Sequence, residues 1–123
     1  MNSSLETLDA SYNEILDIPH NYSILVNLKN LNLSHNSLLF FPKCINQLTN
    51  LEELRINHNH VNSIPLAIRN LTNLKLLDVV DNAISMIPPS LGKCPGLSIV
   101  YDRTLLEKGK HVFMDALEQL KKV

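Results

Sequence analysis

Residues 51–61 read Leu51-Glu52-Glu53-Leu54-Arg55-Ile56-Asn57-His58-Asn59-His60-Val61. Leu54 and Ile56 alternate with polar residues, and this period of two predicts a half-buried β-strand. Asn59 follows the strand, where an amide that both donates and accepts hydrogen bonds can satisfy the backbone of a turn. Val61 then returns an apolar side chain to the core. The stretch therefore predicts a strand, a turn and the start of a return path.

The same pattern recurs along the chain every 23 residues, the distance from Asn13 to Asn36 (36 − 13 = 23). Three series keep this step: Asn13, Asn36, Asn59 and Asn82; Pro19, Pro42, Pro65 and Pro88; and Leu5, Leu28, Leu51, Leu74 and Leu97. A strict period of this length indicates a stack of similar units, none of which buries its apolar face alone. The prolines fix φ where the chain turns, and the apolar spacing after them predicts short helical or 3-10 segments. We expect the asparagines to form a ladder along the stack.

Composition and charge exclude several classes of function. The chain has 123 residues, of which 45% are hydrophobic, enough for one domain with a continuous core. Its net charge of −1 provides no strong field to attract nucleic acid or an anionic membrane. No apolar run is long enough to span a bilayer, and residues 1–4 do not resemble a signal peptide. With only 3 glycines and no phosphate loop, serine elbow or kinase signature, we expect no enzyme and no cofactor.

The two cysteines, Cys44 and Cys94, lie two repeats apart. At ~4.8 Å per strand this separates them by about 10 Å, whereas a disulfide needs Cα atoms within ~7 Å. We therefore expect free thiols, with Cys94 as a small buried hydrophobic residue. Free thiols without an export signal favour a reducing compartment, which predicts a cytoplasmic protein. Glycosylation sequons at Asn21, Asn32 and Asn70 argue against this, although an Asn-rich chain produces such triplets by chance.

The L-x-x-L-x-L-x-x-N-x-L segment occurs four times, with Ala10, isoleucine or valine at some of its leucine positions. The continuation x-x-L/I/F-P-x-x-I/L-x-x-L follows it fully in the second and third repeats, whereas Tyr22 in the first and Cys94 in the fourth depart from it. Over roughly residues 5–101 this pattern resembles leucine-rich repeats of the intracellular 23-residue type, found in Ras-suppressor-like scaffolds and plant Ras-group proteins. The resemblance implies an α/β solenoid, with a curved parallel sheet on its concave side and short helical or 3-10 segments on its convex side. It also implies a non-catalytic module that binds another protein on the concave surface, as a signalling scaffold or adaptor. A small GTPase or a signalling phosphatase or kinase is the partner that the family suggests.

An alternative is that the chain is the recognition segment of a larger repeat-bearing enzyme, such as a kinase, phosphatase or ubiquitin ligase. The absence of an N-terminal lid motivates this hypothesis, and it equally predicts self-association through that end. Residues 1–101 are expected to hold four full repeats and a partial fifth, and residues 102–123 a C-terminal helical cap. A capping-box spacing at residues 104–107 and an apolar face over residues 111–122 predict this capping helix. A partner-binding amphipathic helix is the other interpretation of the same segment.

The constant step also predicts which outward side chains become neighbours on the concave face. The expected columns are Thr7, Asn30, Glu53, Leu76 and Ile99; Asp9, Asn32, Arg55, Asp78 and Tyr101; Ser11, Ser34, Asn57, Val80 and Arg103; and Tyr12, His35, His58 and Asp81. From these columns the predicted protein-binding residues are Asn30, Asn32, His35, Glu53, Arg55, Asn57, His58, Leu76, Asp78, Val80 and Tyr101. The apolar members in the later repeats, Leu76, Val80, Ile99 and Tyr101, predict either an interface or a surface that the C-terminal segment covers.

Arg55 and Asp78 are expected to form a surface ion pair. The histidine column allows three interpretations. His35 and His58, with His60 and Asp81 nearby, could hold zinc or a similar ion. They could instead make an interface that responds to pH, because imidazoles titrate near neutrality. The third interpretation is a solvated polar row without a specific role.

Overall fold

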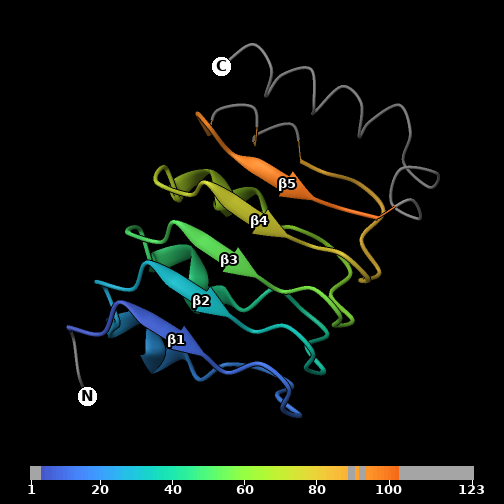
Figure 1. Cartoon of the computed structure of the whole chain (residues 1–123), viewed down its shortest axis with the longest axis horizontal. Helices are drawn as coiled ribbons and strands as arrows, with labels where there is room; N and C mark the ends of the chain where they lie inside the picture. The colour runs from blue at the N-terminus through green and yellow to red at the C-terminus, as the bar shows by residue number, and fades with distance from the viewer. Residues whose placement is uncertain (1–3, 89–90, 92–93, 103–123) are drawn as a thin grey trace.

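The computed structural model of the chain describes residues 4–88, 91 and 94–102. These residues form a regular succession of strands and 3-10 helices (Figure 1). The elements are β1 (Thr7–Asp9), η1 (His20–Ile24), β2 (Asn30–Asn32), η2 (Lys43–Gln47), β3 (Glu53–Arg55), η3 (Leu66–Asn70), β4 (Leu76–Asp78) and β5 (Ser98–Val100). The strands make one parallel sheet in the order β1-β2-β3-β4-β5, so each coil adds one strand beside the last. The predicted solenoid is confirmed.

Each 3-10 helix begins directly after a proline. Pro19, Pro42 and Pro65 occupy the N-cap positions, with φ of −54°, −62° and −72°. The pyrrolidine ring restricts φ to this range and so sets the direction in which the chain turns. After Pro88 the Leu91 N–H donates to the Pro88 carbonyl at 3.1 Å, as residues at this position do in the other coils. The predicted short 3-10 return segments are therefore confirmed.

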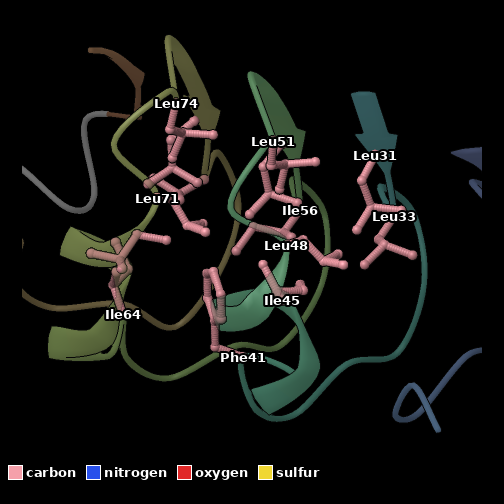
Figure 2. Close-up of a cluster of buried hydrophobic side chains, with 14 of the residues drawn as sticks. Leu31, Leu33, Phe41, Ile45, Leu48, Leu51, Ile56, Ile64, Leu71 and Leu74 are labelled. Atoms are coloured by element: carbon pink, nitrogen blue, oxygen red, sulfur yellow. The ribbon is translucent and has the colours of Figure 1, made fainter. Parts of the chain in front are cut away.

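The hydrophobic core fills the space between the sheet and the 3-10 helices. Figure 2 shows it, with Leu31 and Leu51 on the strand side and Phe41 and Ile45 on the helix side. Side chains such as Leu51 and Ile45 are fully buried, and each burial of this kind contributes about 1.5–3 kcal/mol. In the first repeat Leu8, Ile15 and Ile18 are only partly buried, since no earlier coil packs on them within the described residues.

Asparagine side chains connect successive coils. The Asn36 amide group donates to the carbonyl of Ala10 in the previous coil at 3.0 Å and to the carbonyl of Leu33 in its own coil at 3.1 Å. Its Oδ1 accepts the N–H of Ile15 at 3.0 Å. Asn59 and Asn82 repeat this arrangement one and two coils further on. The predicted ladder is confirmed, and Asn36 and Asn59 are buried within it.

Both cysteines are buried free thiols, as the sequence predicts. Burial raises the pKa of Cys94, and burial together with the negative charge of Asp17 raises the pKa of Cys44. No helix among the described residues is long and apolar enough to cross a membrane. The predicted C-terminal capping helix lies outside the described residues.

Candidate protein-binding face

The solvent-facing side chains of the sheet form a surface that we call the strand face, the predicted concave side. In β2, β3 and β4 the register places Asn30, Glu53 and Leu76 side by side, and likewise Asn32, Arg55 and Asp78. All of these side chains are half-buried, because the neighbouring strands cover their flanks. The first two predicted columns are confirmed through these three strands.

The last strand departs from the constant step. β5 pairs with β4 so that Leu77 lies beside Ile99 and Asp78 beside Val100. Paired residues are therefore 22 positions apart here (99 − 77), whereas they are 23 apart between β3 and β4 (77 − 54). The prediction that Ile99 and Tyr101 continue the outward columns is therefore wrong. A slip of one position moves every side chain to the other face of a strand, so Ile99 packs against the core and Val100 faces outward. The expected apolar cluster loses Ile99 for this reason.

Arg55 pairs with a neighbour on its own strand. Its Nη2 lies 3.0 Å from Glu53 Oε1, and both residues face the same side because they are two positions apart. The expected ion pair between Arg55 and Asp78 is wrong, since Asp78 Oδ1 accepts the Val80 N–H instead, at 3.1 Å. Both partners of the Glu53–Arg55 pair are more than a third exposed, so its contribution to stability is about 0–1 kcal/mol.

Side chains at the ends of the strands stabilise the turns that follow. Asn32 Oδ1 accepts hydrogen bonds from the N–H and the hydroxyl of Ser34, at 3.0 and 2.7 Å. Asp9 accepts the equivalent pair from Ser11, whose hydroxyl makes the larger contribution to lowering the pKa of Asp9. Asn32 therefore has part of its hydrogen-bonding capacity occupied within the fold, which sequence reasoning did not anticipate.

Two amides of the strand face have unused acceptors. The side-chain oxygens of Asn30 and Asn57 are buried and have no hydrogen-bond partner within the described residues. A buried polar atom without a partner is uncommon in folded proteins, because it loses its interaction with water and gains nothing in return.

The fourth predicted column forms a stacked row, which we call the ring row: Tyr12, His35, His58 and Asp81. The Tyr12 and His35 rings are 4.1 Å apart between centroids and 9° from parallel, and His35 and His58 are 4.3 Å apart and 19° from parallel. His58 Nδ1 lies 2.8 Å from Asp81 Oδ2. The stack ends in a carboxylate, and Tyr12 at its other end is 75% exposed.

An unusual backbone conformation holds the ring row in place. All four residues have positive φ, between 56° and 58°, although none of them is glycine. The side chain crowds the backbone in this left-handed region, at a cost of roughly 1–2 kcal/mol per residue. The backbone N–H groups of Tyr12, His35 and His58 each donate to a carbonyl of the next coil, which maintains the conformation. The row therefore repeats because the turn repeats.

The ring row does not have the geometry of a metal site. Stacked imidazoles carry their nitrogen lone pairs in nearly parallel planes, so the lone pairs do not converge on one ion as zinc requires. His58 Nδ1 is also engaged by Asp81. Within the described part of the chain, no group of three or more histidine, cysteine, aspartate or glutamate side chains is suited to holding a metal.

Comparison with known proteins agrees with this architecture. The sequence model of the family described as Leucine Rich Repeat matches residues 27–48, 50–71 and 73–94, more than half of the chain. The chain belongs to the leucine-rich-repeat family. Domains of this family are generally non-catalytic interaction modules. No curated protein matches the chain.

Three solved structures illustrate the similarity. A leucine-rich-repeat protein of Leptospira interrogans is 32% identical with a TM-score of 0.79, over 81% of this chain and 26% of its own. Internalin C2 of Listeria monocytogenes is 30% identical with a TM-score of 0.70, over 90% of this chain and 50% of its own. The Arabidopsis receptor kinase HAESA was solved with a peptide hormone and a co-receptor. It is 33% identical with a TM-score of 0.68, over 77% of this chain and 17% of its own. This chain thus spans half or less of each.

Proposed function

We propose that this chain is a non-catalytic module that binds a protein partner on the strand face, as a signalling scaffold or adaptor. One observation carries the proposal: inward and outward residues of the same strands behave differently. Leu8, Leu31, Leu54 and Leu77 are identical from strand to strand, whereas their outward neighbours change from Asn30 to Glu53 to Leu76. The fold explains the repetition but places no such demand on the outward column of Asn30, Glu53 and Leu76, which is free to provide recognition.

Two features of the strand face and one comparison support protein binding. The half-buried outward side chains of Glu53 and Arg55 place charged groups on the face, where they can meet a polypeptide. The stacked rings of the ring row offer a planar, amphipathic surface, and aromatic side chains are common at protein interfaces. The structural similarity to a receptor kinase solved with a peptide hormone and a co-receptor also supports binding of a polypeptide.

A second candidate is that the chain is the recognition segment of a larger repeat-bearing enzyme. The similarity to HAESA, described as a receptor kinase, favours it, as does the fact that the chain spans 17% of that protein. An immunoblot of the producing cells distinguishes the two candidates. A native species near 13.9 kDa contradicts the larger enzyme, whereas a species several times larger supports it.

Affinity capture from native extract, followed by titration calorimetry with each purified candidate partner, tests the primary proposal. Replacement of Arg55 or His58 by alanine is expected to weaken binding about fivefold or more, because each removes a group from the centre of the strand face. Tyr101 stays a predicted contact and is tested in the same way. The control is Arg69→Ala, an exposed cation on η3 and away from the sheet. Unchanged affinity in the strand-face variants, or an equal loss in the control, contradicts the proposal.

We also propose that the chain acts in the cytoplasm. Its two buried, unpaired thiols support a reducing compartment, where cysteines are not needed as disulfides. Fractionation of the producing cells with an antibody against the chain tests this placement. Recovery of the protein in the medium with a glycan on Asn21 or Asn70 contradicts it.

A further inference from the structure

A second concave feature lies away from the strands, where each coil enters its 3-10 helix. It is a hollow of about 780 Å³ that extends over the first three repeats. Its apolar lining consists of Ile18, Pro19, Phe40, Phe41 and Pro65. Figure 2 shows Phe41 on this side of the core, beyond Ile45 and far from the strands. The hollow therefore shares no lining residue with the strand face.

The rim of the hollow departs from the repeat pattern in a way that the core does not require. The third and fourth positions after each ladder asparagine are Leu16-Asp17, Leu39-Phe40, Asn62-Ser63 and Ser85-Met86. Only the second repeat has two large apolar side chains there, and Leu39 and Phe40 are 49% and 64% exposed. Leu16, at the same position one coil earlier, is 65% exposed. Of these three side chains Phe40 lines the hollow, while Leu16 and Leu39 are neighbours in sequence of the lining residues Asp17 and Phe40. An exposed phenylalanine in the wall of a hollow indicates a docking surface.

The polar groups of the hollow define what would fill it. Asp17 comes from the first repeat and Lys43 from the second, and neither has an ion-pair partner in the described part of the chain. Asp17 Oδ1 accepts only the N–H of Ile18, at 2.8 Å. Asn46, on the same wall, has a buried side-chain oxygen without a hydrogen-bond partner among the described residues. The hollow thus combines an apolar floor with one carboxylate, one ammonium group and the uncharged or titratable polar residues His20, Asn62 and Ser63.

A polypeptide segment matches this combination better than an apolar small molecule. An apolar side chain can lie against the two phenylalanines, while charged residues on either side of it meet Asp17 and Lys43. We propose that the hollow docks an extended peptide segment of a partner protein, with one large apolar side chain between a basic and an acidic residue. This proposal is independent of partner binding on the strand face.

The test is a titration of the ¹⁵N-labelled chain with capped synthetic heptapeptides, followed by amide chemical shifts. Two probes carry leucine between arginine and glutamate, one in each order, because an extended peptide can run in either direction. A third probe replaces the leucine by alanine, and a fourth replaces both charged residues by glutamine. We expect shifts clustered around the hollow with at least one charged probe. Affinity should fall about tenfold without the leucine and severalfold without the charges.

Two variants assign the binding to the hollow. Phe40→Ser should reduce affinity about tenfold without unfolding the domain, since Phe40 is mostly exposed. Met86→Ser is the matched control, because Met86 occupies the same repeat position two coils further on and does not line the hollow; it should bind normally. The proposal is overturned if no probe gives localised shifts, or if Phe40→Ser binds like the unmodified chain. Self-association in sedimentation experiments that Phe40→Ser abolishes also overturns it, in favour of a second copy as the occupant.

Discussion

Replacing Asn59 by alanine tests whether the asparagine ladder holds the coils together. Asn59 Oδ1 accepts the Leu38 N–H at 2.9 Å, and its amide donates to Leu33 O at 2.9 Å and to Ile56 O at 3.0 Å. Asn59 is 4% exposed, so water does not replace these bonds in the variant. With a longer bond from the same amide to Asn57 O, at 3.3 Å, these bonds join two coils at one point in the core.

The expected loss follows from what remains when the amide is removed. The Leu33 carbonyl keeps a second donor from Asn36 and the Ile56 carbonyl one from Asn82, so each lost hydrogen bond reduces the free energy of unfolding by about 1 kcal/mol. The buried Leu38 N–H loses its side-chain acceptor, which costs about 2 kcal/mol. Together these losses destabilise the domain by about 4 kcal/mol, a large part of the 5–15 kcal/mol typical of a folded domain.

Urea unfolding followed by circular dichroism measures this loss, and the chain supplies its own control. With an m-value of about 2 kcal/mol/M, the midpoint of Asn59→Ala should fall by about 2 M. Asn13 has the same repeat position but is exposed and bonds only to carbonyls of its own coil, so Asn13→Ala should cost less than about 1 kcal/mol. A loss below about 1 kcal/mol for Asn59→Ala, or equal losses for the two variants, refutes the reasoning.

Three further predictions concern single residues. His35→Val should destabilise the domain about 1–2 kcal/mol more than His35→Asn in urea unfolding, because a β-branched side chain is strained at a φ of 56° and asparagine is not. The free energy of unfolding should fall as pH rises above about 8.5, because burial raises the pKa of both thiols and the unfolded chain therefore releases its thiol protons at lower pH. A double variant, Cys44→Ala with Cys94→Ala, should show a shallower fall. Ser11→Ala should move the pKa of Asp9 up towards its usual value in an NMR titration. Because the pKa of Asp9 is lowered in the folded chain, its carboxylate stabilises the fold above the carboxyl pKa of the unfolded chain, and this stabilisation is lost as pH falls.

The parts of the fold that depend on the repeat period could be predicted from the sequence. A parallel sheet stacked in register must align residues one period apart, which places Asn36 beside Asn59 and Asn32 beside Arg55. The same argument places His35 beside His58. These placements need no knowledge of side-chain rotamers, because the backbone alone fixes them.

The remaining features depend on choices that the period does not fix. The register places Asp78 beside Arg55, yet the guanidinium pairs with Glu53, so side-chain rotamers and not the register decide this ion pair. The shift at β5 arises because one residue separates Leu97 from Ile99 where two separate Leu74 from Leu77. Pairing the inward apolar residues, rather than counting a constant step along the chain, would have found it. The hollow could not be predicted because Phe40, which lines it, lies between consensus positions, where the repeat pattern makes no prediction.

The two proposed surfaces are built on the same coils but can be changed separately. In the second repeat His35 belongs to the ring row and Phe40 borders the hollow, while buried Leu38, between them in sequence, is held by Asn59. A substitution at an exposed position should therefore affect one surface only, because each coil's rigid core lies between the two. A substitution in the ladder should affect both surfaces, since it displaces one coil against the next. Variants that lose both kinds of binding therefore report on folding, whereas variants that lose one kind report on recognition.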